Sequence, residues 1–142
     1  MNKFYLTNAI AYVNAGPHMG HALEAVQGDA LTRYHRMIGD DVRFLVGTDE
    51  HGSKIQQVAK DRSITPQELA DENSALFQEF HEKVNAANDD FIRTTSERHK
   101  AGARKIWEKI EAAGKFYEKE YEGKYCTGCE GAVRVPIGGL NR

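Results

Sequence analysis

Cysteine, proline and long apolar stretches are all scarce in this chain of 142 residues, which has 2 cysteines and 3 prolines. Two cysteines are too few for the disulfide framework of a small secreted domain. Because no run of about 18 apolar residues occurs and the amino terminus has no long hydrophobic stretch, neither a membrane span nor a signal peptide is expected. The sequence therefore predicts a cytoplasmic protein with no membrane partner.

The chain also lacks a surplus of basic residues. Its formal net charge is -2 and its pI is about 6.3, so a protein that binds nucleic acid mainly through the phosphate backbone is excluded. Any contact with nucleic acid must be local. With 40% hydrophobic and 28% charged residues, the composition is that of one modest globular domain.

The residues that are present alternate between strand and helix patterns. Apolar, aromatic and β-branched residues predict a strand over 3–10 and a second strand over 41–47. Between them, apolar residues at helical spacing predict a helix over 18–38 that Gly39 ends; these residues are Met19, Leu23, Val26, Leu31, Tyr34 and Met37.

The second half of the chain contains more helix signals. Thr65, Pro66 and Glu68 combine an N-cap, a first-turn proline and a capping-box glutamate, and a stripe from Leu69 to Val84 follows them. Further patterns predict a helix over 53–60, an extended segment over 89–96, a helix over 96–114 and a hairpin over 115–129 that turns at Glu122 and Gly123.

Strands joined by helical crossovers predict an α/β fold, a Rossmann-like parallel sheet with helices. Such sheets bind ligands beyond the carboxyl ends of their strands. The polar segments 11–21 and 47–52 each follow a predicted strand. They are therefore expected to meet in one crevice.

His18 and His21 fall at the start of the first predicted helix. The first turn of a helix presents unpaired N–H groups and a partial positive charge, which favour an anion. Gly16 and Gly20 remove side chains where a nucleotide would approach the backbone. Two imidazoles three residues apart share a face and can donate to phosphate oxygens. Two alternatives remain at this point, namely a metal site or two ordinary surface histidines.

Four segments together resemble a known family. "YLTNAIAYVNAGPHMGHALE", "FLVGTDEHG", "DDFIRTTSERHK" and "YEGKYCTGCE", in that order, are similar to the amino-terminal part of the class I aminoacyl-tRNA synthetases, specifically the methionyl-tRNA synthetases of the bacterial type. The likeness covers about residues 3–130. The histidine motif suits the whole class, whereas "GTDEHG" with "FIRTT" narrows it to the methionine branch.

This resemblance implies a methionine-tRNA ligase with a Rossmann-like catalytic domain, which takes ATP with Mg and methionine as substrates and tRNA(Met) as its partner. His18, Gly20 and His21 would bind ATP and stabilise the transition state of adenylate formation. Asp49 would hold the ammonium group of methionine. Ile10 and Tyr12 would line the methionine pocket. Glu24 would contact the ribose or a water unless it is simply solvated, and His51 would be structural.

Cys126 and Cys129 resemble half of the zinc knuckle in the connective peptide of this family. A structural zinc ion needs four ligands, and no cysteine or histidine follows Cys129. Zinc is therefore possible only if His99 or a partner completes the site, and an unmetallated pair is expected. A redox role is disfavoured because the motif follows a predicted hairpin instead of opening a helix.

The sequence also departs from the family. No lysine-rich signature loop and no anticodon-binding domain is present in these residues, so a truncated chain that is impaired alone is expected. The predicted parts are half of the catalytic domain over 1–114, the start of the connective peptide over 115–130 and a divergent tail over 131–142. An uncovered sheet edge and apolar face would follow. A complementary C-terminal fragment is a possible partner, and the alternative functions are a non-catalytic binding module and a small nucleotidyltransferase.

Overall fold

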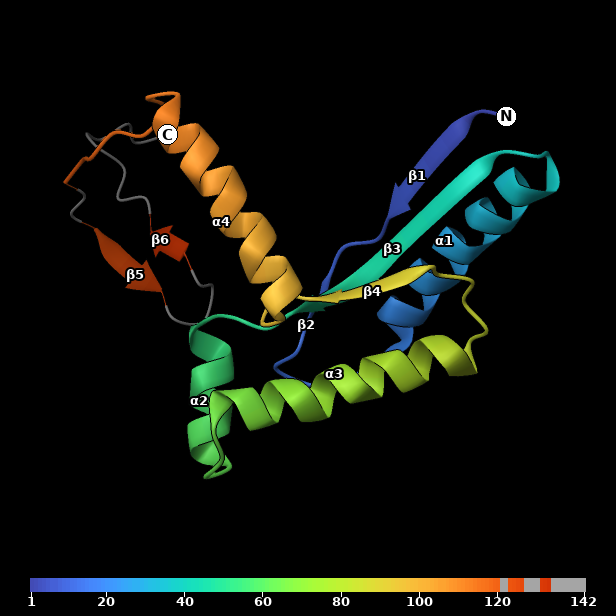
Figure 1. The fold of residues 1–142 in the computed structure, drawn as a ribbon. Coiled ribbons are helices and arrows are strands. Elements are labelled where there is room, and N and C mark those ends of the chain that lie inside the picture. The colour runs from blue at the N-terminus through green and yellow to red at the C-terminus, as the bar shows by residue number, and fades with distance from the viewer. Residues whose placement is uncertain (121–122, 127–130, 134–142) are drawn as a thin grey trace, which may run out of the picture.

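A single long strand organises the sheet. In the computed structural model, which describes residues 1–120, 123–126 and 131–133, strand β3 (Asp41–Asp49) pairs in parallel with β1 (Lys3–Thr7), β2 (Ala11–Tyr12) and β4 (Asp90–Arg93). Thr48 of β3 pairs with Ala11 of β2 and also with Arg93 of β4, so β2 and β4 lie on opposite sides of β3. The predicted parallel α/β sheet is confirmed (Figure 1).

The first predicted strand is shorter than expected. Instead of one strand over 3–10, β1 ends at Thr7 and the chain resumes pairing at β2, inside the segment that was predicted as a loop. The Asn8 side chain donates to the backbone carbonyl of Glu24, 3.1 Å away, which turns this part of the chain toward the first helix. The second predicted strand is longer than expected, because Thr48 and Asp49 still belong to β3.

In the described part of the chain, four helices connect and flank the strands, and their predicted bounds hold to within about two residues. They are α1 (Met19–Met37), α2 (Ser53–Asp61), α3 (Pro66–Lys83) and α4 (Glu97–Ala112). The capping box of α3 forms as predicted, because the Glu68 backbone donates to Thr65 Oγ1 at 3.1 Å and the Thr65 backbone donates to Glu68 Oε2 at 2.7 Å. Gly39 ends α1 with a φ of 87°, a value that favours glycine.

The hydrophobic core lies between the sheet, α2 and α3. Its fully buried members are Val13, Ile55, Ala59, Leu69, Ala70 and Phe77. Helix α1 contacts β1 and β3 through small residues, since its buried side is made of Ala25, Gly28 and Thr32. The apolar stripe that predicted α1 points to solvent, and each of its six members is at least 48% exposed.

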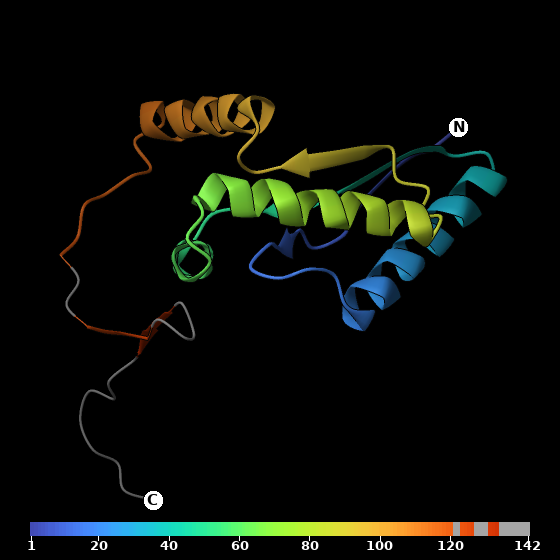
Figure 2. The ribbon, with the colours of Figure 1, turned by 90° about the horizontal axis from the view of Figure 1, so that it is seen from below.

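Helix α4 extends away from the sheet and buries none of its residues (Figures 1 and 2). Beyond it, β5 (Lys124–Cys126) and β6 (Gly131–Val133) form an antiparallel pair. The hairpin prediction was wrong in its position: the paired strands β5 and β6 lie on either side of residues 127–130, and residues 115–120, the predicted first strand, form no strand. The strand was predicted there because charged side chains alternate with aromatic ones over 115–121, as they do in many strands.

Candidate active site

His18 and His21 cap the helix that follows them. His18 is the N-cap residue of α1, and its Nδ1 accepts a hydrogen bond from the Gly20 backbone at 3.1 Å. In return, His21 Nδ1 accepts from the His18 backbone at 3.1 Å. Because a ring nitrogen that accepts a hydrogen bond carries no proton, each neutral imidazole carries its hydrogen on Nε2. The pair therefore forms a capping box and keeps two N–H donors available.

The surroundings of His21 keep its ring neutral. Burial lowers the pKa of His21 below its usual value, and the nearby His18 lowers it further, while Glu24 acts in the opposite direction with a smaller effect. The ring lies 3.9 Å from the His18 ring and meets the edge of Phe77 of α3 at 4.9 Å, measured between centroids. At pH 7 this imidazole acts as a neutral donor.

Gly20 makes room for the His18 ring. A Cβ atom at position 20 would lie 2.9 Å from Cε1 of His18, which is too close for an ordinary contact. A larger residue would force the His18 ring to shift. Gly20 thus leaves room for the ring where it caps the helix, while the predicted approach of a nucleotide stays a prediction.

Glu24 lies one turn further along α1 and contacts the segment after β1. Its Oε1 accepts a hydrogen bond from the Ala9 backbone at 2.9 Å. The side chain is half-buried, so it does not lie on a purely solvated helix face. This contact fixes the segment that leads to Ile10, whose side chain is 40% exposed.

Tyr12 and Asp49 lie side by side at the carboxyl ends of their strands. They are register partners in the β2–β3 pairing, and the backbone of Val13 donates to the Asp49 carbonyl at 3.2 Å. His21 lines a small cavity together with Ala11, the residue before Tyr12, and Gly47, two residues before Asp49. The segments after the first two predicted strands therefore meet at one end of the sheet, as the sequence predicted.

Glu50 was not singled out by sequence reasoning, yet it is the most strongly bound side chain in this region. It is 3% exposed, and it accepts hydrogen bonds from Thr48 Oγ1 at 2.7 Å, from Thr95 Oγ1, and from Arg93 through Nε at 2.7 Å and Nη2 at 3.1 Å. Burial alone would raise the pKa of Glu50, but these hydrogen bonds, first of all those from Arg93, outweigh it and hold the pKa below its usual value.

This ion pair joins the two most specific motifs of the sequence. Glu50 belongs to "GTDEHG" and Arg93 to "FIRTT", and Arg93 also contacts Asp71 of α3. The sequence contained a signal for this ion pair, since a glutamate follows a predicted buried strand and the other motif contains an arginine. His51 is exposed, and its Nε2 lies 3.4 Å from the Thr94 carbonyl, a contact within the same linkage.

The described residues do not form a zinc site. Cys126 ends β5, whereas Cys129 lies outside the described residues. Within the described ranges, no group of three or more histidine, cysteine, aspartate or glutamate side chains is arranged to hold a metal ion, and His99 on α4 brings no such group together. No chemistry through zinc is derived for this chain.

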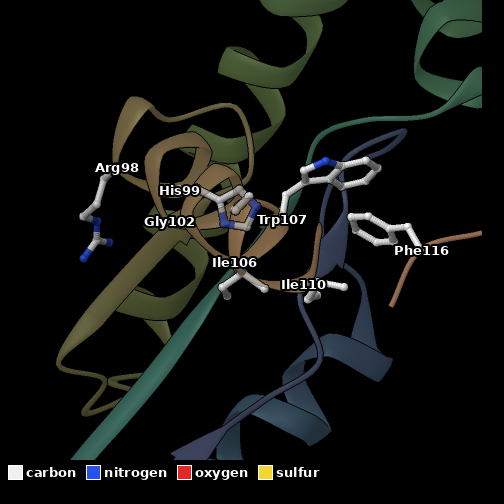
Figure 3. Close-up of a pocket in the computed structure, with 8 residues that line it drawn as sticks. Arg98, His99, Gly102, Ile106, Trp107, Ile110 and Phe116 are labelled. Carbon is white, nitrogen blue, oxygen red and sulfur yellow. The ribbon is translucent and has the colours of Figure 1, made fainter. Parts of the chain in front are cut away.

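One hollow of the described surface is not lined by His18 or His21. It has a volume of about 520 Å³ and runs along α4, where Ile106, Trp107, Ile110 and Phe116 line it (Figure 3). The Trp107 and Phe116 rings lie 4.4 Å apart between centroids. Of the predicted site residues, His99, the candidate zinc ligand, lines it, whereas His18 and His21 do not, so the volume of a hollow does not locate the histidine site.

A parallel sheet whose first crossover helix is capped by paired histidines is the arrangement of a class I tRNA synthetase catalytic domain, and a family model described as tRNA synthetases class I (M) matches residues 4–133. The chain belongs to this family, and within it to the methionyl branch. The methionine-tRNA ligase of Rhizobium meliloti (strain 1021) is 52% identical over 87% of this chain, and that of Bacillus subtilis (strain 168) is 49% identical over 87%.

A solved structure agrees with these relatives. The Mycobacterium tuberculosis methionyl-tRNA synthetase in complex with methionyl-adenylate is 43% identical, with a TM-score of 0.89 over 94% of this chain. The chain spans only 24% of the Rhizobium relative, 19% of the Bacillus relative and 26% of the solved chain. In the part of the chain that the structure describes, no helix is long and apolar enough to cross a membrane.

Proposed function

We propose that this chain carries the ATP- and methionine-binding part of a methionine-tRNA ligase, which activates methionine to methionyl-adenylate. The observation that carries the proposal is the reciprocal capping of His18 and His21, because it holds two neutral Nε2–H donors at a helix N-terminus. Donors of this kind stabilise negative charge that develops on phosphate oxygens as pyrophosphate leaves. ATP would enter with Mg as the substrate.

Methionine would bind beside these donors. Asp49 is proposed to pair with the ammonium group, since it is the last residue of β3 and its backbone carbonyl accepts a hydrogen bond from Val13, in the segment that leads into α1. Tyr12, its register partner, and Ile10 would provide apolar and aromatic contacts for the thioether. Glu24 supports this pocket through its hydrogen bond to Ala9.

The first test is methionine-dependent exchange of labelled pyrophosphate into ATP, together with calorimetric binding of a non-hydrolysable methionyl-adenylate analogue. His21→Ala is expected to reduce the exchange rate by about 100-fold or more, because it removes one donor to the transition state. His99→Ala is the matched control, since this imidazole lies on α4 and should leave exchange unchanged. Exchange that proceeds equally well in His21→Ala, or without methionine, would contradict the assignment; the second result would favour a small nucleotidyltransferase.

Transfer to tRNA(Met) is proposed to need a complementary C-terminal fragment. Two observations on the described residues support this: β1 is an edge strand of the sheet, and the large apolar side chains of α1 are exposed. Adding a carboxyl-terminal fragment of a methionine-tRNA ligase should restore charging of tRNA(Met). Binding of such a fragment without any exchange would favour a non-catalytic binding module.

A further inference from the structure

A small polar cavity lies between α1, α3 and β3, behind the capping histidines. Its volume is about 20 Å³, which suits a single water molecule. Four polar side chains line it, namely Asn8, His21, Glu24 and His81. A bound water needs two to four polar partners, so both the size and the lining of this cavity fit one water.

His81 supplies an imidazole nitrogen that needs a partner. Its Nδ1 is shielded from solvent, and no group among the described residues makes a hydrogen bond to it. The rings of Phe80 and Phe91 meet the His81 ring edge-on at 5.5 and 6.1 Å between centroids and restrict its orientation. A buried polar atom of this kind is usually satisfied by an ordered water when the protein offers no partner.

His81 lines two hollows. It lines the small cavity with Glu24 and His21, and it also lines an open hollow of about 420 Å³ together with Gln78, Glu82 and Asn88. Burial and the nearby His21 lower the pKa of His81, while Glu24 raises it with a smaller effect than burial. The ring is therefore neutral at pH 7 and has one N–H to donate.

We propose that the cavity binds one ordered water that accepts a hydrogen bond from His81 Nδ1–H and donates one to the Glu24 carboxylate. His81 is thereby a positioning residue for Glu24 and for the Ala9 segment that Glu24 holds. An effect of His81 on methionine binding would rest on the proposed function. The water and the tautomer of His81 do not depend on that function. Nothing in the sequence pattern of α3 indicated such a role for His81.

The test is nuclear magnetic resonance of the free chain, with ¹⁵N-labelled histidine at pH 7.5 and without ATP or methionine. The ring nitrogen shifts should show His81 as the Nδ1–H tautomer, the opposite of His18 and His21, and a long-lived water should give cross-peaks to His81. Glu24→Ala should abolish the water signal and move His81 toward the Nε2–H tautomer. Glu82→Ala is the matched control, because this glutamate lines the outer hollow beside the same ring.

A second pair of variants keeps the proposal testable if the first pair perturbs the fold. His81→Phe retains an aromatic ring but removes the donor, and it should accelerate hydrogen exchange of the Ala9 amide by about threefold to tenfold. His81→Gln keeps a donor and should restore slower exchange. An Nε2–H tautomer in the unmodified chain, or equal responses to Glu24→Ala and Glu82→Ala, would overturn the proposal. Loss of pyrophosphate exchange with these signals intact would count only against the proposed function.

Discussion

Helices α1 and α3 have 19 and 18 residues, and both start at a capping box, yet only α3 buries large apolar side chains. Helix α3 buries Leu69 and Phe77 in the core. Helix α1 buries only small or short side chains and exposes residues such as Leu23. The two helices therefore contribute differently to stability, although their sequences predict helices equally well.

The difference shows what apolar periodicity can and cannot indicate. A repeat of three to four residues means that a helix has an apolar side, but it does not say which neighbour covers that side. In α1, Gly28 brings the helix close to the sheet, because a Cβ atom there would lie 2.6 Å from Phe44 Cζ and 2.7 Å from Asn8 Oδ1. The large apolar side chains of α1 are consequently directed away from the described sheet.

The largest expected effect comes from a matched pair of leucines. Leu69→Ala on α3 should lower the free energy of unfolding by about 2–5 kcal/mol, because it removes a side chain that is 1% exposed and leaves a cavity. Leu23→Ala on α1, where the side chain is 62% exposed, should change it by less than about 0.5 kcal/mol. Urea unfolding followed by circular dichroism measures both, and similar losses would refute the comparison.

The next effect concerns the ionic attachment of α3 through Asp71, Arg93 and Glu50. Glu50→Gln should lower the free energy of unfolding by about 2–3 kcal/mol, since it leaves Arg93 without its buried partner. Because the folded pKa of Glu50 is lowered, its contribution is present above the ordinary value of 4.5 and is lost as pH falls through the lowered pKa. Unfolding measured from pH 7 to pH 3 should show this loss in the unmodified chain and a smaller loss in Glu50→Gln.

Substitutions at two glycines test which side of α1 is packed. Gly28→Ala should destabilise the fold by about 1–3 kcal/mol through overpacking against Phe44 and Asn8. Gly102→Ala, in the exposed α4, meets no atom within 4 Å and should stabilise it by about 0.5–1 kcal/mol through helix propensity. If Gly28→Ala were also stabilising, the small-residue side of α1 would not be its packed side.

The smallest effect is expected at the N-terminus of α1. His21→Ala removes the acceptor for the His18 backbone N–H and should lower the free energy of unfolding by about 1 kcal/mol, as the loss of a helix cap usually does. Since the folded pKa of His21 is lowered, its contribution is present above 6.5 and is lost as pH falls through the lowered pKa. From pH 8 to pH 5, the melting temperature should therefore fall less in His21→Ala than in His99→Ala. An equal fall in the two variants would contradict the capping role.

Much of the fold could be predicted because local signals agreed with one another. Thr65 with Glu68 and the stop at Gly39 fixed helix ends to within a residue. The position of the hairpin could not be predicted. Aromatic and charged residues alternate over 115–120 as in a strand, yet these residues pair with no described strand, whereas Gly131–Val133, which does pair with β5, carries no such pattern. The location in the cell, the zinc occupancy and the roles of individual site residues stay predictions.

The parallel sheet, the helix capped by His18, and the meeting of Tyr12 and Asp49 at one end of the sheet could be inferred from the amino-acid sequence, because they follow from periodicity, capping and the rule that parallel strands end together. The three-dimensional arrangement was needed to see that His18 and His21 cap one another, that Glu50 joins Arg93, and that the apolar side of α1 faces solvent. Those three features depend on distances between segments that are far apart in the chain or on ring orientation, and neither is encoded in the spacing of residue types.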